Sequence, residues 1–233
     1  MNYKYRIKFS KTGPIKYIGH LDVMRYFQKA IRRSNLPIAY SAGFSPHQIM
    51  SFAYPLSVGY TSEGEYFDIE MTEQVNKDDI MDALNSQMSD GFSILGVREL
   101  PEKSLNCMSA VYAASYKVTL KESVVLPEDY KEKFVDFMSQ MTIPVNKPKK
   151  KGGGFIEIDL KKFIYSYDIK DRSLYFTVNA SSSDNIKASF VTDVFLEYLN
   201  LDVVPYMYNI HRLDILGNQG TDEDIKLISL LDF

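Results

Sequence analysis

The chain has 233 residues, of which 45% are hydrophobic and 24% charged, and its formal net charge is −3. These proportions are typical of a globular protein and exclude a disordered or fibrous chain. The single cysteine, Cys107, excludes an internal disulfide and an iron–sulfur cluster held by this chain alone, because such a cluster needs several thiolates. No apolar run approaches the ~20 residues of a membrane helix and no leader segment is recognisable, so we expect a cytoplasmic protein that does not enter a membrane.

The first half of the chain alternates between strand and helix patterns. Residues 4–10 alternate apolar and basic side chains, which predicts a strand. Residues 20–34 carry an apolar stripe at helical spacing and end before a proline that no helix continues through. Extended segments are expected over 49–71, a helix capped by an asparagine over 77–88, and a strand over 92–100. The expected apolar stripe of the first helix is Leu21, Met24, Phe27, Ala30 and Ile31.

The second half repeats this order without clear sequence similarity to the first. We expect a strand over 110–120 and a helix over 127–141 with its apolar residues inward. Two adjacent strands over 155–171 and 173–181 should follow. The last elements are a helix over 189–200 and a closing strand over 208–217.

This order, βαββαβ twice, predicts an α+β fold of two tandem ferredoxin-like domains with antiparallel sheets. The expected domains are residues 1–103 and 109–220, joined by a polar linker over 101–109. Residues 221–233 would form a tail that contains a short helix.

The small net charge conceals an uneven distribution. The first fifty residues contain nine basic residues and one acidic residue, whereas residues 51–110 contain three basic and eleven acidic residues. Segregation of this kind predicts one surface that binds anions and one that repels them.

The residues with most chemical character lie in the first helix and the loop that follows it. Basic residues recur on a second face of the helix, although a cationic face is also typical of a helix that is simply solvated. The loop combines aromatic, hydroxyl and imidazole groups, as binding loops do. A Lys-Pro-Lys-Lys-Lys-Gly-Gly-Gly run in the second half is either solubilising or a second phosphate contact. The candidate RNA-binding residues are Arg25, Lys29, Arg32, Arg33, Tyr40, Ser41, Phe44, Lys147, Lys149, Lys150 and Lys151.

No catalytic constellation is assigned, but three residues are candidates for acid–base chemistry: His20, Asp22 and His47. Each also has a structural interpretation, since His20 and Asp22 begin a helix and His47 follows a Ser-Pro turn. The three histidines of the chain, with His211, lack the close spacing of a zinc site, so we expect no metal. No phosphate-binding or dinucleotide motif predicts a cofactor.

Several long motifs resemble one bacterial family. These are YIGHLD at 17–22, LPIAYSAGFSPH at 36–47, SEGEYFDIE at 62–70, and the basic run before FIEIDL at 147–160. Together they resemble the radical-SAM-linked proteins, a family with a domain of unknown function. The resemblance implies a radical SAM protein as partner.

We therefore expect a non-catalytic companion of a radical SAM enzyme that binds RNA, such as tRNA or rRNA, and presents it for modification. Two alternatives stay open. One is an RNA-processing or RNA-modifying enzyme that uses His20 and His47 as acid and base. The other is a pure protein–protein adaptor, whose acidic segment around Glu63, Glu65, Asp68 and Glu70 would meet a basic surface.

Overall fold

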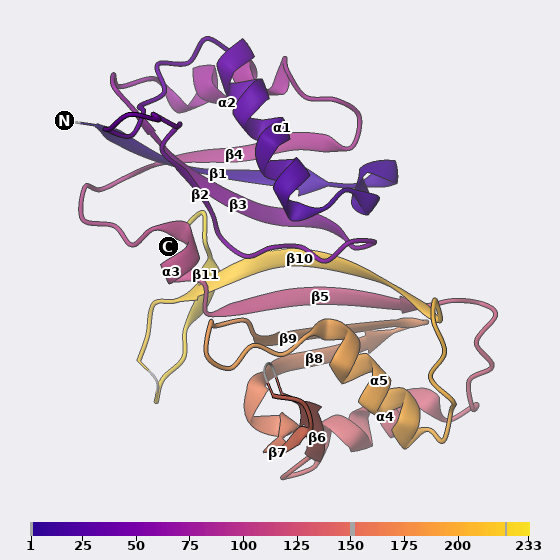
Figure 1. Ribbon diagram of the computed structural model, residues 1–233. Helices are drawn as coiled ribbons and strands as arrows, with labels where there is room; N and C mark the ends of the chain where they lie inside the picture. The colour runs from indigo at the N-terminus through magenta and orange to yellow at the C-terminus, as the bar shows by residue number, and fades with distance from the viewer. Residues whose placement is uncertain (1, 150–151, 222) are drawn as a thin grey trace. The chain divides into compact units, whose positions relative to one another are not determined.

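The computed structural model describes residues 2–149, 152–221 and 223–233 (Figure 1). The chain forms two compact units, residues 1–113 with 211–233 and residues 114–210. The expected α+β class is confirmed, since helices accompany strands that pair mostly in antiparallel fashion.

The first unit is built on a sheet in which β4, β1, β3 and β10 lie in that order. The strands β1 and β3 pair from Tyr3↔Met71 to Lys11↔Ser62, and β4 pairs antiparallel with the other edge of β1. The pairing between β10 and the start of β3 is parallel. The strands of this unit are β1 (Tyr3–Lys11), β2 (Met50–Phe52), β3 (Thr61–Met71), β4 (Phe92–Leu100), β10 (Tyr208–Asn218) and β11 (Leu227–Ser229).

Two helices cover one face of this sheet, α1 (His20–Arg33) and α2 (Lys77–Asn85), as Figure 1 shows. The core between them and the sheet is aromatic: the Phe27 ring of α1 lies 4.6 Å from that of Phe9 and 4.9 Å from that of Phe67. Edge-to-face and tilted aromatic pairs at these distances stabilise a core beyond the area they bury.

The buried stripe of α1 differs from the predicted one in the first turn. Val23 is buried, whereas Leu21 is 65% exposed. Phe27, Ala30 and Ile31 are buried as expected. Val23 lies one turn before Phe27 on the same face of the helix, whereas Leu21 lies on another face.

The opposite face of the sheet is covered by the short helix α3 (Cys107–Ala110) and by the C-terminal tail. Tyr66 packs there with Cys107, Ile215 and Leu230. The tail contains the strand β11, which pairs with β10, so the short helix expected there is wrong. The tail follows the edge of β10 because its backbone groups find partners in that strand.

Gly64 in β3 allows β10 to come close. A Cβ at this position would lie 2.4 Å from the Cα of Asp214 and 2.6 Å from the carbonyl oxygen of Leu213. Both atoms belong to backbone, so no side-chain rotation would relieve the clash.

In the second unit, β5 (Ala113–Leu120), β9 (Ser173–Asn179) and β8 (Ile164–Lys170) lie in that order in a sheet. The helices α4 (Tyr130–Ser139) and α5 (Ala188–Tyr198) contact each other through the rings of Phe134 and Phe195, whose centroids are 5.0 Å apart.

The single strand expected over 155–171 is broken. It forms β7 (Phe155–Asp159), a 3₁₀ helix (Leu160–Phe163) and β8, and β7 pairs with the unexpected strand β6 (Pro144–Pro148). Asp159 ends β7, since its carboxylate accepts hydrogen bonds from the backbone N–H groups of Ile143 and Lys161.

The units divide the chain differently from the predicted domains, because residues 211–233 accompany the first unit. The side chain of Asp214 explains this placement: it accepts hydrogen bonds from Lys8 and Tyr66, which lie in β1 and β3. The assignment of two tandem ferredoxin-like domains stays a prediction.

Breaking the buried ion pair of Arg6 and Asp68 should strongly destabilise the folded chain. We expect Asp68→Asn to lower the free energy of unfolding by about 3 kcal/mol, because it leaves the guanidinium of Arg6 buried without a counter-charge. Asp22→Asn removes a carboxylate from an exposed pair with Arg25, so the free energy of unfolding should change little. Urea unfolding of both variants measures the difference, and equal effects would contradict this role for the buried pair.

Candidate nucleic-acid interface

The cationic face predicted for α1 is present. Its four basic residues, Arg25, Lys29, Arg32 and Arg33, are all exposed. The Nη1 of Arg25 lies 3.4 Å from the Oδ1 of Asp22. The guanidinium of Arg33 donates hydrogen bonds to the side-chain and backbone oxygens of Gln87. Within the described residues, Lys29 and Arg32 have no such partner. The last-turn cations are also favoured by the helix dipole, so part of this pattern serves the helix itself.

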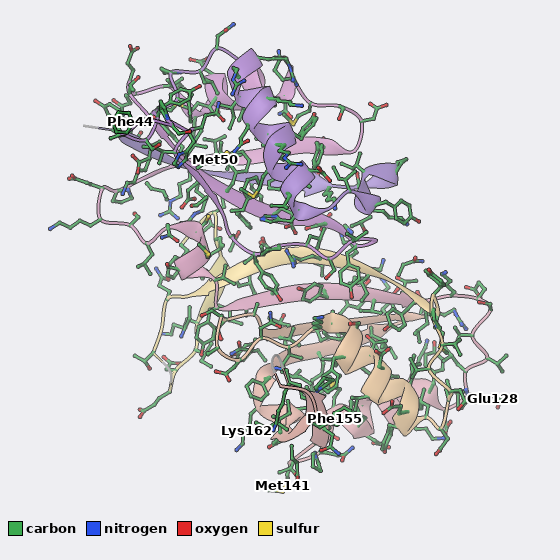
Figure 2. All side chains as sticks on the ribbon, in the orientation of Figure 1. Phe44, Met50, Glu128, Met141, Phe155 and Lys162 are labelled. Atoms are coloured by element: carbon green, nitrogen blue, oxygen red, sulfur yellow. The ribbon has the colours of Figure 1, made fainter. Side chains whose placement is uncertain are left out.

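The loop after α1 is a hairpin-like segment over residues 39–49. The backbone N–H of Ser41 donates to His47 O at 2.8 Å, and that of Ile49 donates to Ala39 O at 2.9 Å. The Ser41 Oγ lies 2.8 Å from His47 Nδ1, which ties the two sides of the segment together. Its tip carries Phe44, which is 111% exposed, and Figure 2 shows this side chain at the edge of the unit.

The C-terminal turn of α1 and this hairpin lie at the same end of the sheet. Ile38 bridges to Met71, which pairs with Tyr3 at the start of β1. The other end of α1 begins at His20, close to Lys11 at the end of β1. The helix therefore carries Arg32 toward the end where the hairpin begins.

The three candidates for acid–base chemistry have separate surroundings. His20 packs edge-on against Phe52, with ring centroids 5.5 Å apart, while His47 is exposed and bonded to Ser41. Asp22 is exposed and paired with Arg25. Within the part of the chain that the structure describes, these three residues share no partner, so the geometry does not assemble an acid and a base around one substrate.

The surroundings of His20 indicate a structural role. It lines a cavity of about 10 Å³ beside Lys11 and Glu65, which has room for about one water. Burial, and then the charge of Lys11, lower the pKa of His20. A substrate of nucleotide size does not fit there.

The Lys-rich segment belongs to the second unit and flanks the hairpin of β6 and β7. Lys149 is exposed, whereas Lys147 donates to the backbone oxygen of Asn185 at 2.6 Å. Lys150 and Lys151 lie outside the described residues.

Part of the charge that is segregated along the chain is neutralised inside the first unit. Arg6 of β1 is 1% exposed and bonds both carboxylate oxygens of Asp68 in β3, at 2.8 and 3.0 Å. Lys8 pairs with Asp214 at 3.1 Å. Arg6 and Asp68 are directly opposed in the pairing of β1 with β3, whereas the carboxylate that meets Lys8 comes from β10.

The acidic segment considered as an adaptor surface is partly used inside the unit. Glu65 is 5% exposed and accepts from Arg212 at 2.8 and 3.0 Å, and Asp68 is bonded to Arg6. Glu63 is exposed and lies 3.6 Å from His211. The carboxylates of Glu65 and Asp68 are thus bonded inside the unit and contribute little to a surface that meets a partner.

Cys107 is not a reactive thiol. Burial, and then the carboxylate of Asp68, raise the pKa of Cys107 to about 12. Its Sγ donates to Ser51 O at 3.0 Å. Within the described residues, no three His, Cys, Asp or Glu side chains gather as metal ligands would.

Sequence reasoning missed two groups of polar residues. One is the buried set of Lys11, Glu65 and Arg212. Each is a charged residue on the apolar side of a strand pattern, and this position could have predicted its burial. The other is Gln48 in the hairpin, which is 4% exposed and has no signal in the sequence.

The lowered pKa of His20 predicts a loss of stability in acid. The folded chain protonates His20 less readily than the unfolded chain does. The stability that neutral His20 contributes is therefore complete above the usual pKa of 6.5, and it is lost as the pH falls through the lowered pKa. His20→Asn should therefore lose less stability than the wild type between pH 7.5 and 5, measured by urea unfolding. His47→Asn removes an exposed imidazole outside the cavity that His20 lines and is the control. If His20→Asn behaves like this control, His20 does not carry the effect.

None of the helices in the described residues combines the length and apolar character needed to cross a bilayer.

No curated protein matches the chain. Among solved structures, the chain is similar to one from "Crystal Structure of a Cbf5-Nop10-Gar1 Complex", with 12% identity and a TM-score of 0.44, over 89% of this chain and 47% of that one. The chain thus spans less than half of that protein chain's length. The model of a family described as "Uncharacterized protein conserved in bacteria (DUF2344)" matches residues 4–188, more than half of the chain, and the chain belongs to this bacterial family.

Proposed function

We propose that this protein binds RNA through the exposed face of α1 and the 39–49 hairpin, and that it presents the RNA to a radical SAM enzyme without catalysing the reaction itself. The observation that carries the proposal is the full exposure of the Phe44 side chain. The hairpin that carries it starts at the end of the sheet where α1 ends. The last turn of α1 contains Arg32, which has no partner within the described residues.

The chemistry of these groups suits a single-stranded segment or a loop of RNA. Arg25, Lys29 and Arg32 offer charge to phosphates, and they repel one another on one helix face unless an anion lies between them. Phe44 and Tyr40 offer aromatic faces on which unpaired bases stack. Exposing a phenylalanine ring to water is unfavourable, and a stacked base would bury it.

The two faces of the sheet in the first unit are not available for such contacts. The helices α1 and α2 cover one, and α3 with the tail covers the other. This supports a binding surface on the helix and the hairpin instead.

The finer assignment of the fold is part of the same proposal. The order β1, α1, β2, β3, α2, β4, with β4, β1 and β3 adjacent and antiparallel, supports a ferredoxin-like first unit. The second unit has β5, α4, β8, β9 and α5 in a similar order, interrupted by the β6–β7 hairpin.

The radical SAM partner rests on the sequence resemblance of the motifs at 17–22, 36–47 and 62–70. Within this chain, the separate surroundings of His20 and His47 support a role in presenting RNA to another enzyme.

Replacement of the free cations should weaken RNA binding and reduce its salt dependence. For Lys29→Gln/Arg32→Gln, we expect the slope of log K against log salt to fall by about 1.4, because each phosphate of a single strand that a cation neutralises contributes about 0.7 to this slope. The measurement is the binding of unstructured RNA and of tRNA across a salt series. Lys131→Gln/Lys170→Gln removes two exposed lysines of the second unit and is the matched control.

A second variant separates stacking from charge. Phe44→Ala should weaken binding by about 1–3 kcal/mol at every salt concentration and leave the salt slope unchanged, because stacking on an aromatic ring involves no counterion. The proposal is wrong if wild-type protein shows no salt-sensitive RNA binding, or if both variants bind as the wild type does.

A further inference from the structure

We propose that Gln48, together with Tyr40, forms a site that reads the edge of one unpaired base of the RNA, preferring adenine. This inference rests on the proposed function and adds base selectivity to it.

The register of the hairpin places the two side chains together. Tyr40 and Gln48 form an antiparallel bridge, bracketed by the hydrogen bonds from Ser41 N to His47 O and from Ile49 N to Ala39 O. Directly opposed residues of an antiparallel pair point to the same face, with Cβ atoms about 5 Å apart. The hydrogen bond between the next pair along, Ser41 and His47, agrees with this register on the other face.

Gln48 is the unusual member of this pair. It is 4% exposed, and neither its Nε2 nor its Oε1 has a hydrogen-bond partner in the described structure. Buried amides are nearly always bonded, because an unsatisfied donor or acceptor keeps its full desolvation cost. Within the described residues, no other buried side chain leaves polar atoms without a partner. A ligand that satisfies this amide would recover that cost.

The amide requires a ligand edge that carries a donor beside an acceptor. It presents one acceptor and one donor side by side, which match the N6 amino group and N7 of adenine in a bidentate pair. Tyr40, which is 48% exposed and directly opposite Gln48, is the aromatic neighbour on which the base would stack. The buried amide would turn outward beside this ring to meet the base. The cations of α1 would hold the flanking phosphates.

The test compares oligomers of adenylate, uridylate and cytidylate of equal length in binding to the full-length protein. The wild type should bind the adenylate oligomer about tenfold more tightly than the other two, as expected for one bidentate amide–base pair. Gln48→Met keeps the shape of the side chain and removes both polar atoms, so this preference should disappear while the salt slope stays the same. Gln74→Met, at an exposed glutamine bonded to Glu99, should keep the preference.

Unfolding supplies a second readout that does not depend on RNA. Because the amide of Gln48 has no partner, Gln48→Met should unfold at the same or a higher urea concentration than the wild type. A lower midpoint would mean that the folded chain already satisfies the amide, and it would overturn the inference.

The outcomes separate the two proposals. Salt-sensitive binding without a preference for adenylate, or a preference that survives in Gln48→Met, overturns the base-reading site and leaves RNA binding intact. Absence of salt-sensitive binding to any oligomer and to tRNA overturns both.

Discussion

The guanidinium of Arg6 is the group on which the first unit depends. It is 1% exposed and donates to Asp68, to Leu230 O in the tail and to Leu105 O before α3. One buried charge thus joins β1 to β3, to the segment before α3 and to the C-terminal tail. A buried charge is tolerable only when it is paired and its donors are satisfied, so these segments have to occupy their places together.

This internal pairing decides which charges remain for function. The cations of β1 and the carboxylates of β3 and β10 neutralise one another, as Lys8 and Asp214 also do. Basic residues on α1 have no counterpart of this kind beyond the weak exposed pair of Arg25 with Asp22. A chain with a net charge of −3 can therefore present a local cationic surface.

The hairpin after α1 combines order with exposure. Backbone hydrogen bonds and the contact between Ser41 and His47 fix its two sides, yet Phe44 at its tip is fully exposed. A loop that is held by its own backbone loses little entropy when a ligand binds to it. That is the arrangement expected of a preformed surface, and the buried amide of Gln48 gives it a chemical preference.

The sequence alone determined several of the local elements. Alternation in 4–10 and the helical spacing of Phe27, Ala30 and Ile31 predicted β1 and α1, because these patterns reflect which side of one element is buried. It also identified the cationic face of α1 and the loop at 40–47 as chemically unusual.

Tertiary structure decided the rest. Only folding shows that Asp68 and Asp214 neutralise β1, that the tail pairs with β10, and that His20 and His47 have separate surroundings. These outcomes depend on contacts between residues far apart in the chain, which no local pattern encodes. The burial of Gln48 beside Tyr40 is of the same kind, since a glutamine in a polar loop gives no sign by itself that its amide will lose water.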